Sequence, residues 1–149
     1  MHPEVGNNVQ LARQLEITVE GPLDPENPKV VGLVGSLAES MTARDFARRV
    51  QEVMGREPLL IEGDAMVRRV GWCTGGGQGY IDTAIAAGVD LFLSGEASEQ
   101  TFHSARENGV SFIAAGHHAT ERYGVQALGD YLARRFALEH LFIDCPNPI

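Results

Sequence analysis

The feature that most constrains the fold is a repeated order of apolar run, glycine-bearing break and helical segment after residue 66. The apolar runs at Val67–Cys73, Val89–Leu93 and Val110–Ala115 have the length and composition of buried strands. A segment with helical periodicity follows each run. Strands separated by helices form βαβ units, so this order predicts an α/β fold with a mostly parallel sheet and helices on both faces.

Residues 1–29 lack this regular pattern. Pro22, Pro25 and Pro28 occur within seven positions, and each proline lacks a backbone donor and restricts the residue before it. We therefore predict an irregular connecting segment over residues 1–29, ahead of an α/β domain over residues 30–149.

Residues 30–66 are predicted to form a strand, a helix and a second strand. Short apolar runs at Val30–Val34 and Leu59–Ile61 fit the strands. Between them, Thr42 followed by Asp45 resembles a capping box, and Gly55 is a typical helix stop.

The C-terminal region is predicted to form a long helix over about 119–136 and a closing strand at Leu141–Ile143. The helix carries an apolar row that we expect to be buried, consisting of Val125, Leu128, Leu132 and Phe136.

Composition restricts the partners of this chain. Its 149 residues include 20 acidic residues and 12 Lys and Arg, which give a net charge of −8 and disfavour binding to nucleic acid. No apolar run approaches the ~18–20 residues of a membrane span, and the start lacks the basic and apolar regions of a signal peptide. The two cysteines, Cys73 and Cys145, are too few for a disulfide framework. We therefore expect a cytoplasmic protein with no membrane or nucleic-acid partner.

The first strand-to-helix junction is rich in glycine. Gly75, Gly76 and Gly77 leave backbone amides free and allow a ligand to approach closely, so they are candidates for contact with an anion or a substrate. The alternative is a tight turn with close helix packing. The glycine spacing matches neither a dinucleotide fingerprint nor a P-loop.

The second junction carries Glu96, Glu99 and His103. These residues are spaced i, i+3 and i+7, so they could share one face of a helix and serve metal binding or proton transfer. Alternatively, acidic residues in a first helical turn complement the helix dipole, and Glu99 with His103 is an ordinary surface pair.

The third junction contains the adjacent residues His117 and His118, followed by Glu121. His117 and Glu121 are spaced i, i+4, which sets imidazole and carboxylate side by side as a divalent cation requires. The alternative is a histidine at a helix N-terminus with Glu121 balancing the dipole. In an open α/β sheet such junctions meet at the carboxyl edge of the strands, so we expect the three junctions to form one site.

Five stretches together resemble the NIF-three-like family, which includes bacterial YbgI-like proteins known as GTP cyclohydrolase I type two homologues. They are His2-Pro3-Glu4-Val5-Gly6-Asn7-Asn8, Cys73-Thr74-Gly75-Gly76-Gly77, Ser94-Gly95-Glu96-Ala97-Ser98-Glu99-Gln100, Gly116-His117-His118-Ala119-Thr120-Glu121 and Ile143-Asp144-Cys145-Pro146-Asn147-Pro148.

The resemblance implies a pair of divalent metal ions (zinc, manganese, iron or similar) in proteins that assemble as toroidal hexamers. His117 and Glu121 match the late metal ligands of the family. The metal pair would activate a water for hydrolysis of a small molecule that the family does not define. The resemblance also implies that Glu96, His103 and His118 line the cleft as catalytic residues, together with the glycine turn.

Members of the family carry a further segment ahead of the one that resembles His2-Pro3-Glu4. That segment holds a histidine pair and an aspartate that supply the remaining ligands, so only His117 and Glu121 are present in this chain. Two alternatives to a metal-dependent hydrolase stay open: an oligomeric scaffold or binding module without enzymatic activity, and a nucleotide-binding domain built on the turn at residues 75–79, with Glu96 as the ribose-binding acid.

Overall fold

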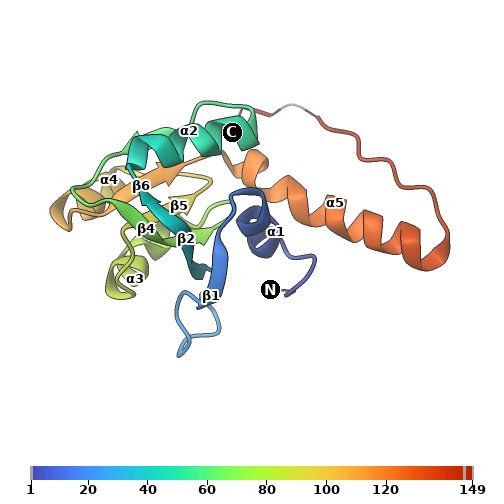
Figure 1. The fold of residues 1–149 in the computed structure, drawn as a ribbon, viewed down its shortest axis with the longest axis horizontal. Coiled ribbons are helices and arrows are strands. Elements are labelled where there is room, and N and C mark those ends of the chain that lie inside the picture. Colours follow the sequence, from blue (N-terminus) through green and yellow to red (C-terminus); the bar gives the residue numbers. More distant parts are fainter. Residues whose placement is uncertain (1, 146, 149) are drawn as a thin grey trace.

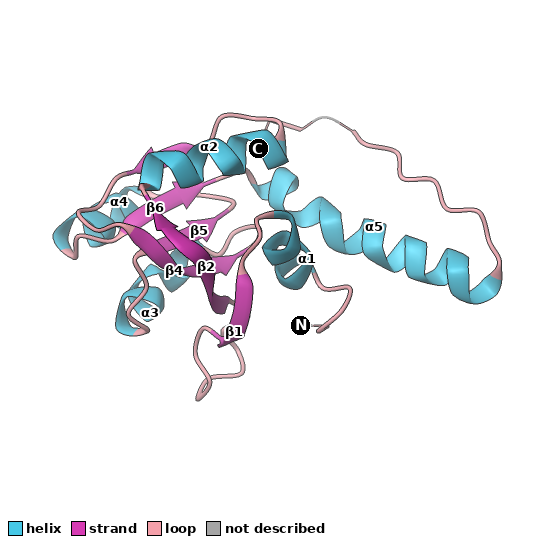
Figure 2. Ribbon diagram, in the orientation of Figure 1, coloured by secondary structure: helices cyan, strands magenta, loops and turns pink. Residues whose placement is uncertain are grey.

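The computed structural model describes residues 2–145 and 147–148 and contains one mixed sheet with helices on both of its faces (Figures 1 and 2). The strands are β1 (Thr18–Pro22), β2 (Leu33–Met41), β3 (Leu59–Ile61), β4 (Val67–Cys73), β5 (Leu91–Ser94) and β6 (Ser111–Ala114). The helices are α1 (Asn7–Gln14), α2 (Ala43–Met54), α3 (Ile81–Ala86), α4 (Glu99–Glu107) and α5 (His117–Phe136), with a short 3-10 helix, η1, at Gln78–Tyr80.

The strand order is β1-β2-β4-β5-β6-β3, and only the centre of the sheet is parallel. β5 pairs in parallel with both β4 and β6. The outer pairs β1–β2, β2–β4 and β3–β6 are antiparallel. The α/β class is therefore confirmed, whereas the expected mostly parallel pairing holds for the two central pairs alone. Apolar runs identify strands but do not encode their direction, which depends on how the connections cross the sheet.

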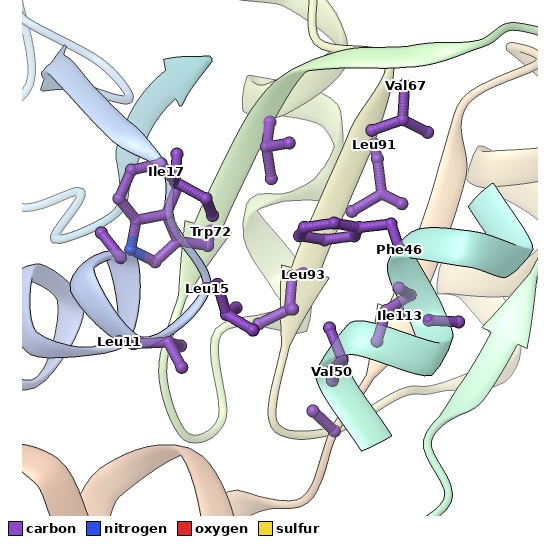
Figure 3. Close-up of a cluster of buried hydrophobic side chains, with 14 of the residues drawn as sticks. Leu11, Leu15, Ile17, Phe46, Val50, Val67, Trp72, Leu91, Leu93 and Ile113 are labelled. Atoms are coloured by element: carbon purple, nitrogen blue, oxygen red, sulfur yellow. The ribbon is translucent and has the colours of Figure 1, made fainter. Parts of the chain in front are cut away.

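Two hydrophobic cores lie on opposite faces of the sheet because successive strand residues point in opposite directions. In β5, Leu91 and Leu93 belong to the core beneath α1 and α2, which Figure 3 shows around Phe46 and Trp72. Phe92 belongs to the other core, with residues of α3 and α4. Helices on both faces are thus confirmed.

The predicted helix after Thr42 is confirmed as α2. The Thr42 hydroxyl accepts a hydrogen bond from the Asp45 amide at 3.1 Å, and the helix ends at Gly55 with a φ of 71°. A positive φ at this position favours glycine, so the local sequence determines both ends of α2.

The prediction of an irregular segment over residues 1–29 is wrong, because this region contains α1 and β1. α1 is eight residues long and buries Leu11 and Ala12 completely. β1 is an edge strand, and Pro22 lies at its end, where a missing backbone donor is tolerated. Tertiary packing therefore orders a segment whose local pattern is weak.

Two predictions at the C-terminal end are also wrong. The apolar row of α5, consisting of Val125, Leu128, Leu132 and Phe136, is 39–61% exposed, because this part of the helix extends beyond the sheet (Figure 1). Leu141–Ile143 forms no strand, and the chain there returns along α5 as an extended tail (Figure 1). Within the described residues, no helix combines the length and hydropathy that a membrane span requires.

Candidate functional site

The three junctions meet at the carboxyl edge of the parallel strands, as predicted. The Gly95 amide donates to the Gly75 carbonyl at 2.9 Å, and the Gly116 amide donates to the Gly95 carbonyl at 2.9 Å. The buried Ser94 hydroxyl also donates to the Gly75 carbonyl, at 3.1 Å. These hydrogen bonds continue the pairing of β4, β5 and β6 into the loops that follow them. They therefore fix the three loops relative to one another.

His117 lies between two carboxylates, one from the loop after β5 and one from the next turn of its own helix, α5. Its Nδ1 is 2.5 Å from Glu96 Oε1, and its Nε2 is 3.2 Å from Glu121 Oε2. The i, i+4 pairing of His117 with Glu121 is therefore confirmed. Nδ1 of the ring faces Glu96 and Nε2 faces Glu121. Contacts on both sides of the ring therefore determine its orientation.

The two carboxylates change the protonation of the site. The hydrogen bond that His117 donates to Glu96 is the main cause of a raised pKa of His117, and the charges of both carboxylates act in the same direction. The same hydrogen bond lowers the pKa of Glu96. The raised pKa extends the pH range over which His117 is protonated, and over that range a cation at Nε2 must compete with a proton.

Gly75 allows this arrangement because it has no side chain. Its φ is 66°, and a Cβ placed on it would lie 2.5 Å from Glu121 Oε1 and 3.0 Å from His117 Nε2. Any larger residue would therefore displace the two side chains. The first junction thus contacts the candidate site directly.

The other two glycines play different roles. A Cβ on Gly76 would meet Glu96 Oε1 at 3.5 Å, an ordinary contact distance, so this position borders the site. A Cβ on Gly77 would clash with Cys73, which agrees with the alternative of a tightly packed turn. Burial raises the pKa of the Cys73 thiol to about 11, so this side chain remains protonated and packs as an apolar group.

Sequence reasoning missed two residues that hold the first junction in place. Asn8 Oδ1 accepts a hydrogen bond from the Thr74 backbone amide at 2.8 Å, and Asn8 Nδ2 donates to the Val31 carbonyl at 2.6 Å. The buried Thr120 hydroxyl accepts from the Gly75 amide at 2.9 Å. Both residues occur in the family-like stretches, but only the fold shows that they contact the glycine turn.

The expected cluster of Glu96, Glu99 and His103 does not form. α4 begins at Glu99 with Ser98 as its cap, so Glu96 precedes the helix and cannot share its face. Glu96 points instead toward His117 and Gln78. His103 is exposed and lies edge-on to the Phe102 ring, with 5.4 Å between ring centroids.

His118 lies beside the site and contacts the C-terminal tail. Its Nε2 is 3.3 Å from Asp144 Oδ1, and Arg122 Nη1 is 3.0 Å from Asp144 Oδ2. A cavity of about 390 Å³ separates this part of α5 from the tail, and both His117 and Glu121 also line it. His118 therefore faces the same cavity as the candidate metal ligands.

The chemistry of His117 and Glu121 fits part of a divalent-metal site. Metal-binding histidines usually donate their second ring N–H to a carboxylate, and Glu96 provides such a partner for His117. Glu121 supplies an oxygen donor beside Nε2, in the space that Gly75 leaves open. Within residues 2–145 and 147–148, however, no group of three or more His, Cys, Asp or Glu side chains could hold a metal ion. The chain thus offers two candidate ligands, fewer than a stable site normally has.

Relatives with similar sequences match nearly the whole length of this chain. A Pseudomonas aeruginosa protein named GTP cyclohydrolase 1 type 2 homolog is 73% identical over 148 residues, which cover 99% of this chain and 59% of that protein. A Haemophilus influenzae protein of the same name is 49% identical over 150 residues, with 99% and 59% covered. The chain thus spans about 59% of the length of these relatives.

Solved structures have the same fold. A structure described as protein ybgI, of unknown function, matches with a TM-score of 0.93 at 49% identity and covers 99% of this chain and 59% of that one. The Thermus thermophilus protein TTHA1606 matches with a TM-score of 0.85 at 34% identity, with 99% and 58% covered. The family model described as Duf34/NIF3 (NGG1p interacting factor 3) matches residues 1–148. The chain therefore belongs to the Duf34/NIF3 family.

Proposed function

We propose that this chain contributes His117 and Glu121 to a divalent-metal site of a metal-dependent hydrolase that acts on a small molecule. The observation that carries the proposal is the placement of His117, with Nδ1 held by Glu96 and Nε2 directed at Glu121. Relatives bear the name GTP cyclohydrolase 1 type 2 homolog, which favours hydrolysis over other reaction classes. Zinc, manganese or iron suits a site of imidazole and carboxylate donors.

Each residue at the site has a separate role in this proposal. A bound divalent ion would supply a water of lowered pKa as the nucleophile. His117 and Glu121 would hold the ion, and Glu96 would orient the His117 ring and fix its Nδ1 proton. His118 would face the substrate from the cavity wall, and the amides of the glycine turn would border it. We assign no role to His103 in this proposal, because it lies on α4 with its ring against Phe102.

The two ligands present in this chain predict weak binding of one metal ion. Calorimetric titration of the metal-stripped chain with zinc and with manganese should show one weak site per chain. His117→Ala should lower the affinity for the metal by at least about tenfold, or 1.4 kcal/mol. His140→Ala is the matched control, because His140 also pairs with a carboxylate, Asp130 at 2.8 Å, but away from the site. Two tight sites per chain, or equal losses in both variants, would contradict the proposal.

A second candidate function is an oligomeric scaffold without enzymatic activity. The exposed apolar row of α5 favours it, since such a row on a soluble domain marks an interaction surface. A well-folded oligomer that binds no zinc or manganese and hydrolyses no phosphate ester would favour this candidate over the hydrolase. We infer self-association in both cases.

A further inference from the structure

The carboxylate of Asp144 occupies a position between two nitrogen donors on α5. Arg122 Nη1 contacts Asp144 Oδ2 at 3.0 Å, and His118 Nε2 contacts Asp144 Oδ1 at 3.3 Å. Arg122 and His118 are spaced i, i+4, so they project from the same side of the first turns of the helix. The carboxylate therefore uses both of its oxygens, as a bound anion would.

Arg122 is prepositioned for this contact. Its Nη2 donates to the Met54 carbonyl at 3.1 Å, so the guanidinium is tied to the end of α2 independently of the tail. The side chain is 23% exposed, and a guanidinium keeps its charge at any physiological pH. Removing Asp144 would thus leave a fixed, partly desolvated cation in the wall of the cavity.

Most of the described residues of the tail segment that carries Asp144 are exposed. Leu141 and Ile143, which precede it, are 77% and 79% exposed, so of these three apolar residues only the half-buried Phe142 between them adds burial that holds the tail. Beyond Asp144, Arg56 Nη1 donates to the Pro148 carbonyl at 2.9 Å on the protein surface. Because the Asp144 side chain is itself 45% exposed, a dissolved anion can compete with it.

We infer that Arg122 and His118 form a binding position for an oxyanion group, a carboxylate or a phosphate, and that Asp144 fills this position when no ligand is bound. The position shares its cavity of about 390 Å³ with His117 and Glu121, so a small ligand held there reaches the candidate metal ligands. Only the designation of that ligand as the substrate rests on the proposed function. The binding position itself requires no metal.

Binding of inorganic phosphate to the metal-stripped chain tests this inference. Phosphorus NMR titration should show weak binding to the wild-type chain, and Asp144→Asn should strengthen it about tenfold, because a competing charge is removed while the size of the side chain is kept. Adding Arg122→Gln to Asp144→Asn should abolish the gain. Asp130→Asn is the matched control, because it removes the same charge from another histidine contact on α5.

Acetate as a competitor distinguishes the two chemical classes. Displacement of phosphate by acetate shows that the position accepts carboxylates, and a lack of displacement restricts it to phosphate. The inference is overturned if Asp144→Asn, folded with an unchanged melting temperature, binds phosphate no better than Asp130→Asn does. The phosphate titration contains no metal. A negative result there contradicts the oxyanion position alone, whereas a negative result in the zinc and manganese titrations contradicts the proposed function.

Discussion

At the scale of single residues, the contact of His117 with Glu96 should make stability depend on pH at both ends of a window. The pKa of His117 is raised above its ordinary value of 6.5. Its contribution to the free energy of unfolding is therefore fully present below pH 6.5 and is lost as the pH rises through the raised pKa. The pKa of Glu96 is lowered from 4.5. Its contribution to the free energy of unfolding is therefore present above pH 4.5 and is lost as the pH falls through the lowered pKa. Both side chains are more than a third exposed, so the effect is small.

Glu96→Gln isolates this contact. In NMR titrations of the His117 ring, the variant should lower the pKa of His117, because it removes the main cause of the upward shift. Urea unfolding should show the largest loss of stability inside the window and a shrinking loss above the raised pKa of His117. The affinity for zinc should fall by about tenfold or more, as for other carboxylates that orient a metal-binding histidine. An unchanged His117 titration would show that Glu96 does not position the ring.

At the scale of elements, the turn between β4 and η1 depends on Gly75. Gly75→Ala should destabilise the chain by about 1–2 kcal/mol, because alanine is strained at a positive φ. It should also weaken metal binding, because its Cβ would lie 2.5 Å from Glu121 Oε1. Urea unfolding and metal titration measure the two effects.

Gly79→Ala serves as the control for that turn. No atom lies within 4 Å of a Cβ placed on Gly79, and its φ is not positive. The free energy of unfolding of the Gly79→Ala variant should therefore stay within roughly 0.5 kcal/mol of the wild-type value. Equal losses at Gly75 and Gly79 would mean that the geometry of the turn does not determine the site.

At the scale of the whole molecule, the exposed apolar row of α5 predicts self-association. Val125, Leu128, Leu132 and Phe136 recur every three or four residues and form one stripe on a helix that extends past the sheet (Figure 1). Light scattering at tens of micromolar should give a mass well above the 16.1 kDa of one chain. Leu132→Asp should shift the protein toward the monomer.

Met66→Asp is the control for self-association. Met66 is 54% exposed, more than Leu132 at 39%, but it lies in the loop before β4 rather than on α5. The same charge placed there should leave the mass unchanged. A wild-type chain that is monomeric under these conditions would contradict the assignment of the α5 row to an interface.

The sequence by itself determined the local features of this protein. The cap at Thr42, the stop at Gly55 and the buried strands of the central sheet depend on residues that are close in sequence, so their patterns predict them. The i, i+4 pairing of His117 with Glu121 belongs to the same class, because helix geometry alone brings the two side chains together. The shared edge of the three junctions also follows from the βαβ order.

Only the tertiary structure decided the features that depend on residues far apart in the chain. Asn8 holds the Thr74 amide across 66 positions, and Glu96 turns away from α4 to reach His117 across 21 positions. The direction of the outer strands and the exposure of the α5 row likewise depend on which segments pack against them. Periodicity shows that a helix has an apolar face, but whether that face is covered depends on surfaces that the rest of the fold brings to it.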